Sequence, residues 1–390
     1  MSTPPPELTK THTPRGATHY PALDLIRALA CIWVAVAHLT IITGRQVYVV
    51  SQGQLAVDLF ILTSGFLMCL VLHNGRDPAT AVAMPFYVRR FFRIAPAFYV
   101  AVALYTVFHS DFLRLLDAAQ GHFATATREN YANPGVPPAT IALHVSFLHG
   151  LSPRDALRIF GPAWTLSLEA QFYVVAPFVI PLLRVRPLVT LAAAFAINLL
   201  GNHLFGTFTH LGTWIHFDYP SILPSRIFLF LLGAWTCMFL SDSRTSRGLL
   251  LLASCGATFL LFGAKSGIVA TGGVALVCAM ASRHFPARAL FDGFMRSAPV
   301  RFIANISYGI YLFHMFLIAF CFAAIRTMFP ASPASTAAVT CYFAMVLTAM
   351  CIVSALVFRF VEEPLRLLGR RIAGRLKPHV QLKPPPDAAA

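Results

Sequence analysis

Charged side chains are scarce in this sequence of 390 residues. Only 12% of the residues are Asp, Glu, Lys or Arg, and 57% are hydrophobic, whereas a soluble domain usually carries about 25% charged residues. A single soluble core stops growing near ~250–300 residues and still needs a charged surface. The shortage of charge therefore excludes an ordinary soluble domain and indicates a protein whose solvent is lipid.

Acidic residues are the scarcer kind, with 15 Asp and Glu against 30 Lys and Arg, and the formal net charge is +15. A basic excess can indicate nucleic-acid binding, but here the basic residues follow the short loops between apolar segments. With the N-terminus placed in the cytoplasm, roughly 22 of them fall on the cytoplasmic side, as the positive-inside rule requires. The excess therefore orients a membrane protein, and we expect a lipid bilayer and no nucleic acid as its partner.

Metal-ligand and disulfide spacings are missing as well. All eight cysteines lie in apolar segments, which is typical of small core residues. The histidines lack the spacing and the acidic partners of a zinc site. We therefore expect no metal, no disulfide framework and no permanently bound cofactor. Residues 1–19 are polar and rich in Pro and Thr, so the first apolar segment is predicted to be an internal span rather than a cleavable leader.

Apolar runs of spanning length, by contrast, recur along the whole chain. A helix needs ~20 mostly apolar residues to cross ~30 Å of hydrocarbon. The sequence therefore predicts an all-α, polytopic membrane bundle of about ten transmembrane helices, an even number that places both termini in the cytoplasm. The predicted spans are 22–43, 55–73, 92–109, 163–183, 187–205, 224–241, 248–264, 267–282, 302–325 and 336–360. A short turn, 263–267, separates the seventh span from the eighth.

One membrane domain with two tails is the predicted organisation. We expect a disordered cytoplasmic tail over 1–19, the transmembrane domain over 20–366, and a basic, Pro-rich cytoplasmic tail over 367–390. The connection 110–162 is the one long loop, expected on the outer side, and loops of this length are usually functional or disordered. An ordinary connecting loop is the simpler alternative.

Ionisable residues inside the predicted spans are the candidates for function, because they are costly in a bilayer and usually face the bundle interior. The first span holds Asp24, Arg27 and His38. Positions eleven apart on a helix nearly eclipse, so Arg27 and His38 share one face, about 16 Å apart along the axis. Asp24 lies one turn before Arg27, near the same face. The simpler alternatives are a snorkelling Arg27 paired with Asp24, and a packed core histidine at position 38.

Other spans carry polar residues of the same kind. These candidates are Asp58, Ser64, Glu169, Tyr311, His314 and Glu362. Tyr311 and His314 share a helix face with Ser307, because the three lie at i, i+4 and i+7. Glu362 belongs to an acidic and basic cluster that is most simply an interfacial ion-pair network.

Three arginines, Arg89, Arg90 and Arg93, fall in the predicted connection between the second and third spans. Guanidinium groups at an inner interface suit either anionic lipid headgroups or a phosphorylated ligand. On these residues alone, both interpretations stay open.

Six segments in order carry a family resemblance. They are Tyr20-Pro-Ala-Leu-Asp24-Leu-Ile-Arg27 followed by His38, Val57-Asp58 to Phe66-Leu67, Arg90-Phe-Phe-Arg93, Trp164-Thr-Leu-Ser-Leu-Glu169 to Tyr173, Ser307-Tyr308 to His314, and Glu362-Glu363-Pro364-Leu365. Together they resemble the motifs of the membrane-bound acyltransferase family 3, whose members O-acylate sugars and related acceptors. The resemblance implies an acyl-CoA donor on the cytoplasmic side and an acceptor that carries a sugar hydroxyl. The chain resembles the stand-alone form of the family, without a fused soluble domain.

The resemblance also implies that Arg27, His38, Arg90 and Arg93 are functional. We expect the three arginines to hold the anionic nucleotide and pyrophosphate part of acyl-CoA. Acetyl is the acyl group that family frequency favours, while succinyl and longer chains stay open. The acceptor and the oligomeric state are open as well.

His38 is the predicted general base. It takes the proton of an acceptor hydroxyl as that hydroxyl attacks the thioester. Glu169 or Asp58 orients His38, in the manner of a triad carboxylate. A covalent acyl intermediate on Ser64 or His38 is the open alternative.

The competing function is a multi-span secondary transporter or flippase for an anionic or glycan-linked substrate. Such a protein also has many helices and interior charges, but it favours helices broken by Gly or Pro and a related second half. Neither is evident in the sequence. We therefore expect an acyl-CoA-dependent O-acyltransferase of the cell inner membrane that modifies a polysaccharide or another glycan.

Overall fold

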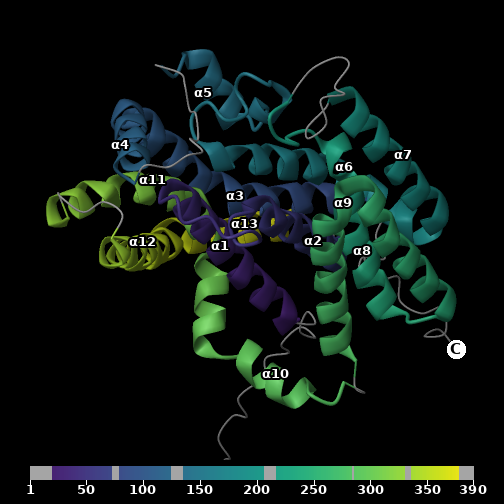
Figure 1. The fold of residues 1–390 in the computed structure, drawn as a ribbon. Coiled ribbons are helices and arrows are strands. Elements are labelled where there is room, and N and C mark those ends of the chain that lie inside the picture. Colours follow the sequence, from purple (N-terminus) through teal and green to yellow (C-terminus); the bar gives the residue numbers. More distant parts are fainter. Residues whose placement is uncertain are drawn as a thin grey trace, which may run out of the picture.

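All secondary structure in the described part of the chain is helical, as the sequence predicts (Figure 1). The computed structural model describes residues 20–72, 79–123, 135–205, 217–282, 285–329 and 335–376. The predicted N-terminal tail and the end of the predicted C-terminal tail lie outside these residues.

Among the described residues, eight helices are long and apolar enough to cross a membrane. They are α1 (Pro21–Ile42), α2 (Gly53–Leu72), α3 (Ala79–Val107), α6 (Trp164–Val185), α7 (Pro187–Phe205), α9 (Thr245–Ala281), α11 (Ala298–Met328) and α12 (Thr336–Val357). α8 (Ile227–Ser241) is apolar but shorter. The chain is thus a multi-pass membrane protein, while the count of ten spans and the sides of the termini stay predictions.

Helix α9 contains the predicted turn between the seventh and eighth spans. Its backbone leaves the helical region at Gly263, where φ is +78°, a conformation that glycine adopts without strain. A Cβ built on Gly267 would lie 2.6 Å from the ring of Phe259. In a straight helix two residues eight apart are ~12 Å apart along the axis. The two halves of α9 therefore fold back on each other.

Helix α3 begins much earlier than the sequence predicts. The third span is predicted from residue 92, but α3 starts at Ala79 and includes the whole arginine segment. Arg90 is buried, and its guanidinium carbon lies 5.6 Å from the ring centroids of both Phe86 and Tyr173. The placement of the arginines in a connection is therefore wrong, because aromatic rings of α3 and α6 cover a charge that looked solvent-exposed.

The segment 110–162 is largely folded, and the expectation of one long loop is wrong for its described part. It forms α4 (His109–His122), α5 (Pro138–Val145) and two single 3-10 turns, η1 (His149–Leu151) and η2 (Gly161–Ala163). Phe112 of α4 is fully buried. In Figure 1, α5 lies at the opposite end of the molecule from α10 (Arg288–Met295).

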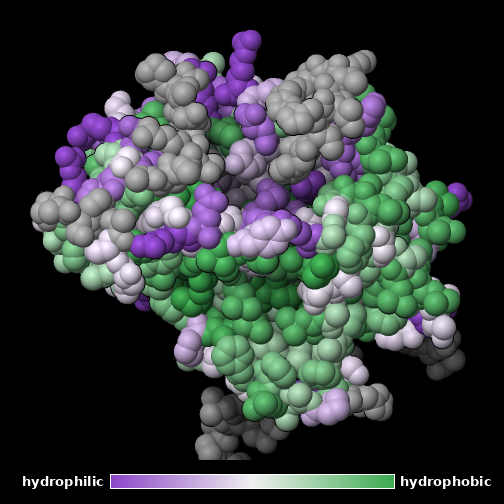
Figure 2. Space-filling model, in the orientation of Figure 1, coloured by the Kyte–Doolittle hydropathy of each residue, from purple (hydrophilic) through white to green (hydrophobic). Residues whose placement is uncertain are grey.

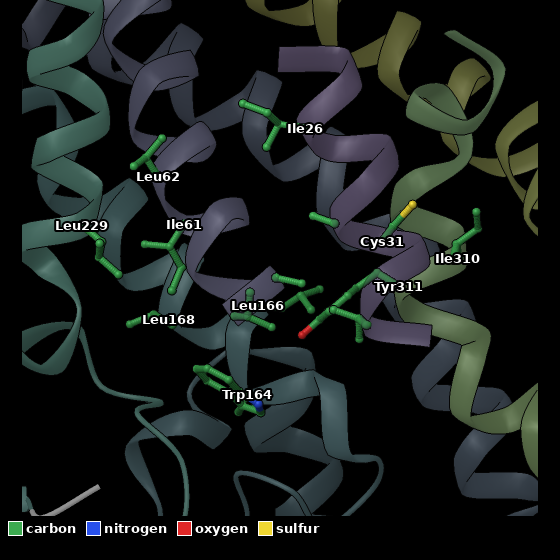
Figure 3. Packing of buried hydrophobic residues seen from close by; sticks show 14 of the residues in the cluster. Ile26, Cys31, Ile61, Leu62, Trp164, Leu166, Leu168, Leu229, Ile310 and Tyr311 are labelled. Carbon is green, nitrogen blue, oxygen red and sulfur yellow. The ribbon is translucent and has the colours of Figure 1, made fainter. Parts of the chain in front are cut away.

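The centre of the bundle is built from α1, α2, α6, α8 and α11, whose apolar side chains interdigitate (Figure 3). Helices α2 and α8 approach most closely at Gly65 and Gly233. A Cβ at Gly65 would overlap the backbone carbonyl of Phe230, and one at Gly233 would overlap that of Leu62. Small residues of this kind let membrane helices approach backbone to backbone.

The rim of the bundle is apolar on the outside. Leu188 and Val189 of α7 and Leu249 and Leu252 of α9 are exposed, and hydrophobic residues cover the face over α7, α8 and α9 (Figure 2). In a membrane protein such side chains face lipid.

The remaining elements close the chain. They are the 3-10 turn η3 (Leu223–Ser225), the π-helical turn η4 (Phe358–Glu362) and α13 (Glu363–Arg375). Helix α13 runs past the predicted domain boundary at 366 and packs against α3, where Gly369 meets the ring of Phe92. Turn η4 matters for the site, because it sets the direction of Glu362.

Candidate active site

Two cavities meet in the bundle. The larger, about 1320 Å³, is lined by His38, Gln54, Trp164 and Arg226 among others, and we call it the His38 cavity. The smaller, about 180 Å³, is lined by residues of α1, α2, α3, α6, α8, α11, η4 and α13. We call it the arginine cavity, because Arg27, Arg93 and Arg366 line it.

Helix α1 contributes to both cavities. Arg27 lines the arginine cavity and His38 lines the His38 cavity, so the residues predicted to share one helix face both point into the interior. Asp24 lies in the first turn of α1 and is half-buried. It is close enough to act electrostatically on Arg27, and an acidic residue is favourable at a helix N-terminus.

The arginine cavity combines positive and negative groups. Arg27 Nη2 donates a hydrogen bond of 3.0 Å to Ser307 Oγ. Glu169 of α6 also lines this cavity and accepts hydrogen bonds from Ser64 Oγ at 2.6 Å and from the Tyr173 hydroxyl at 2.5 Å. The cavity thus holds fixed donors for an anion beside a carboxylate that is already hydrogen-bonded.

Of two further predicted site residues, Glu362 lines the arginine cavity and Arg90 does not. Glu362 is 8% exposed and lines it, because the π-helical turn η4 shifts the helix face at that point. Such turns occur often at functional sites. Arg90 does not line either cavity and lies between the rings of Phe86 and Tyr173. It therefore supports the wall rather than facing the interior.

His38, on the wall of the His38 cavity, lies beside a second histidine. The ring centroids of His38 and His314 lie 5.1 Å apart with an interplanar angle of 37°. His314 is fully buried, and its Nδ1 lies 2.8 Å from the backbone carbonyl oxygen of Tyr311. Both histidines are candidates from the sequence, but their positions in the sequence do not predict that their rings lie side by side.

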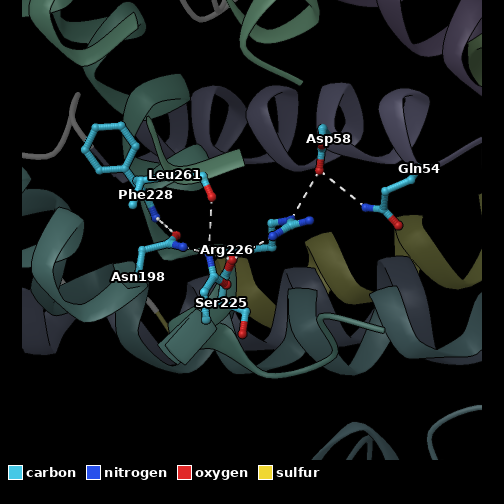
Figure 4. A network of polar contacts seen from close by, with 8 residues as sticks. Gln54, Asp58, Asn198, Ser225, Arg226, Phe228 and Leu261 are labelled. Atoms are coloured by element: carbon cyan, nitrogen blue, oxygen red, sulfur yellow. Dashed lines mark hydrogen bonds and ion pairs between the residues drawn. The ribbon is translucent and has the colours of Figure 1, made fainter. Parts of the chain in front are cut away.

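Asp58, a predicted partner of His38, is paired with an arginine. Arg226 Nε donates to Asp58 Oδ1 at 3.2 Å, and Gln54 Nε2 donates to the same oxygen at 3.4 Å (Figure 4). Asp58 is 0% exposed and Arg226 3% exposed, so each charge neutralises the other inside the bundle. The guanidinium also lies 4.8 Å from the ring centroid of Phe262.

The turn that carries Arg226 is itself held in place. Asn198 Nδ2 of α7 donates to the Ser225 carbonyl at 3.1 Å, and the Phe228 amide donates to Asn198 Oδ1 at 3.3 Å (Figure 4). Sequence reasoning missed this pairing, because 168 residues separate Asp58 from Arg226. The sequence feature that could have indicated a buried charge is the isolated Arg226, directly before an apolar run.

Tyr311 separates the two cavities. Both Tyr311 and Val57 line the two cavities. The Tyr311 hydroxyl donates to the Pro162 carbonyl at 3.1 Å and lies 2.8 Å from Thr165 Oγ1. Figure 3 shows this hydroxyl directed toward the segment of Trp164 and Leu166. A path from Arg27 to His38 would therefore pass Tyr311.

The wall of the His38 cavity also carries aromatic and amide side chains that sequence reasoning did not single out. They include Tyr48, Gln46, Asn202 and Tyr219. The Lys265 ammonium lies 4.1 Å from the ring centroid of Tyr48. Aromatic faces and amide groups in a concave site suit a polar organic ligand.

A second histidine pair lies outside both cavities. The rings of His144 and His149 stack with centroids 4.1 Å apart and an interplanar angle of 8°. Both are fully buried, and burial lowers the pKa of His144 to about 3 and that of His149 to about 4. These residues hold the α5 segment against the bundle rather than face a cavity.

Comparisons with known proteins agree with the sequence motifs. The peptidoglycan O-acetyltransferase OatA of Listeria monocytogenes is 27% identical over 403 residues, which cover 92% of this chain and 58% of the relative. The O-acetyltransferase OatA of Staphylococcus aureus is 25% identical over 344 residues, covering 80% of this chain and 52% of the relative. The chain thus spans little more than half the length of these relatives. No solved structure matches the chain.

The family comparison covers nearly the whole membrane domain. The acyltransferase 3 family, described as an acyltransferase domain, matches residues 20–358. This range contains every residue that lines the two cavities except Glu362 and Arg366. The resemblance read from six sequence motifs is confirmed, and the chain belongs to the acyltransferase 3 family.

Proposed function

We propose that this protein is a membrane-bound O-acyltransferase that moves an acetyl group from cytoplasmic acetyl-CoA to a hydroxyl of a carbohydrate-type acceptor. The observation that carries the proposal is the placement of Arg27 and His38 on one helix, in two cavities that share a wall at Tyr311. The relatives' names support the acetyl group and a peptidoglycan-like acceptor. Acetyl-CoA is here a donor substrate and not a resident cofactor.

The proposal includes a topology. Ten spans, with α9 supplying two of them, place both termini in the cytoplasm of a cell inner membrane. The Arg27 end of α1 then faces the cytoplasm, and the His38 end faces the outside. Basic residues at the Arg27 end favour this orientation.

The arginine cavity is the proposed donor site. Its volume of about 180 Å³ is below the ~300–1,000 Å³ of pockets that enclose a whole drug-sized ligand. It therefore holds one part of the donor. Arg27 and Arg93 suit its phosphate groups, because guanidinium binds such oxygens in a bidentate manner.

The His38 cavity is the proposed acceptor site. An acceptor hydroxyl attacks the thioester carbonyl carbon, and His38 takes the hydroxyl proton. A carbon–oxygen bond forms, the carbon–sulfur bond breaks, and the proton on His38 passes to the departing thiolate. The products are an O-acetylated acceptor and free CoA.

Purified protein in nanodiscs tests the proposal. Release of CoA thiol from acetyl-CoA is followed with soluble peptidoglycan fragments as acceptor, for wild type, His38→Ala and the control His122→Ala. His122 lies on α4 and does not line either cavity. We expect release in wild type and His122→Ala and a loss of at least about a hundredfold in His38→Ala.

Each other outcome is informative. Equal release in His38→Ala would refute the assignment of His38 as base. If wild type neither releases thiol nor binds acetyl-CoA in a direct binding measurement, the acyl-CoA proposal fails. Uptake of a glycan-linked substrate by proteoliposomes would then favour the transporter alternative.

A further inference from the structure

Two of the aromatic rings on the wall of the His38 cavity already have a cation over one face. The Lys265 ammonium lies 4.1 Å from the ring centroid of Tyr48, and the Arg226 guanidinium lies 4.8 Å from that of Phe262. The face of an aromatic ring is electron-rich and attracts such groups. These two rings are therefore engaged with side chains of the protein itself.

The other aromatic rings of this wall differ in exposure. Trp164 is 3% exposed and Tyr311 is 8% exposed, whereas Tyr219 is 39% exposed. The ring centroids of Tyr219 and Trp164 lie 5.6 Å apart with an interplanar angle of 33°. Trp164 thus packs beside Tyr219 from the buried side, and Tyr219 is the ring of this pair that a ligand in the cavity can cover.

The backbone that follows Tyr219 is anchored to the bundle. Gln171 Nε2 of α6 donates to the Ser221 carbonyl at 2.9 Å, and the Leu223 amide donates to Gln171 Oε1 at 2.9 Å. Ser221 Oγ donates to the Gly150 carbonyl at 2.7 Å. Ser221 is 0% exposed. A ring carried by a segment held in this way loses little freedom when a ligand binds, which favours binding.

We propose that Tyr219 is the stacking platform for a pyranose ring of the acceptor glycan, with Trp164 backing it. A pyranose ring presents C–H groups on its face, and these complement the electron-rich and apolar face of the phenol ring. Hydroxyls at the edge of the sugar need hydrogen-bond partners, and the amides of Gln46 and Asn202 line the same cavity. The inference rests on the proposed function of the His38 cavity as the acceptor site.

Stacking at Tyr219 would also select which hydroxyl reacts. The His38 cavity, about 1320 Å³, exceeds the ~300–1,000 Å³ of pockets that enclose a drug-sized ligand, so it has room for more than one sugar. Tyr219 and His38 line this one cavity. A sugar fixed on Tyr219 therefore limits the hydroxyls of the glycan that can reach His38.

Two variants of Tyr219 separate the ring from the hydroxyl. Tyr219→Phe keeps the aromatic face, and Tyr219→Leu replaces it with an aliphatic side chain. We expect the KM for soluble peptidoglycan fragments to rise about tenfold in Tyr219→Leu and to stay within about twofold in Tyr219→Phe. The KM for acetyl-CoA should be unchanged in both. Tyr99→Leu on α3 is the matched control, because Tyr99 does not line either cavity.

Binding without acetyl-CoA supplies a readout that needs no turnover. Protein in nanodiscs is titrated calorimetrically with glycan strands freed of their peptides and, separately, with the free peptides. We expect the strands to bind wild type, Tyr219→Phe and Tyr99→Leu alike and to bind Tyr219→Leu about tenfold more weakly. The free peptides should show no dependence on residue 219.

The outcomes distinguish this inference from the proposed function. If wild type binds the strands but neither binds acetyl-CoA nor releases thiol, the acyl-CoA proposal fails, and the titration still decides on Tyr219. If wild type turns over while Tyr219→Leu keeps its affinity for the strands, only the stacking role is overturned. Equal losses in the Leu and Phe variants, or no binding of strands to wild type, also overturn it. Should Tyr219→Leu fail to elute as a folded protein in detergent, Tyr219→Gln takes its place with the same expectation.

Discussion

Two arginines of one short motif have different surroundings. Arg93 lines the arginine cavity, whereas Arg90, three residues earlier, lies between the rings of Phe86 and Tyr173. Positions three apart lie only ~60° apart around a helix, so the difference comes from the rings of Phe86 and Tyr173, which contact the Arg90 guanidinium. The motif therefore combines a residue that faces the arginine cavity, the proposed donor site, with one that contacts rings of both α3 and α6.

Substitutions of Arg93 and Arg90 should therefore have different effects, one on donor binding and the other on stability. Arg93→Gln is expected to raise the KM for acetyl-CoA about tenfold or more, because it removes charged hydrogen bonds to the donor. Arg90→Gln is expected to lower the thermal unfolding midpoint, because it removes cation–π contacts worth about 2 kcal/mol when desolvated. Initial rates and thermal unfolding of both variants in detergent check this. A raised KM with an unchanged midpoint in Arg90→Gln would place Arg90 in the donor site.

Glu169 and Ser64 form the second pair with a testable consequence. Ser64 Oγ donates to Glu169 Oε1 at 2.6 Å, and hydrogen-bonded residues that act as one unit show non-additive losses. We expect Ser64→Ala and Glu169→Gln each to lower kcat about a hundredfold, and the double variant to be no slower than the slower single. Rates of CoA release measure this. If the two reductions in kcat multiply in the double variant, the two residues act separately. Asp292→Asn on α10 serves as the control.

At the scale of elements, the local properties of the sequence predicted most helices. Length and apolarity gave α1, α2, α7 and α11 within a few residues, and the helical period placed Arg27 and His38 on one interior face. The start of α3 was missed, because Arg90 is covered by a ring from α6 that is distant in sequence. The pairs Asp58–Arg226 and His38–His314 were missed for the same reason, since spacing along one helix carries no information about a neighbour.

The close approach of α2 and α8 at Gly65 can be tested by the stability of a Gly65→Ala variant. Gly65 follows Ser64, so a shift of α2 here also moves a cavity residue. Gly65→Ala is expected to destabilise the protein by about 1–3 kcal/mol, because the added methyl overlaps the backbone of Phe230. Gly272→Ala in α9 is the matched control, since nothing lies within 4 Å of a Cβ there. Equal thermal midpoints for the two variants would contradict the close approach of α2 and α8.

For the whole molecule, stability should depend on pH through a part of the fold that faces neither cavity. The buried rings of His144 and His149 stack at 4.1 Å, and Asp155 lies close to both. Burial is the main cause that lowers their pKa values to about 3 and about 4, from 6.5. The folded protein therefore keeps both rings neutral at a pH where an unfolded chain protonates them.

The sign of the effect follows from proton linkage. Below about pH 6.5 the unfolded state binds more protons than the folded state, so stability falls as pH falls, by up to ~1.4 kcal/mol per pH unit for each histidine. Above about pH 7 both states are neutral at these positions, and the pair contributes no slope. We expect the thermal midpoint of wild type to decrease from pH 7 to pH 5 and to be less sensitive in His144→Gln. His144→Gln removes the titration of this one ring. If the thermal midpoint of the variant decreases as much as that of wild type, groups other than His144 cause the acid sensitivity.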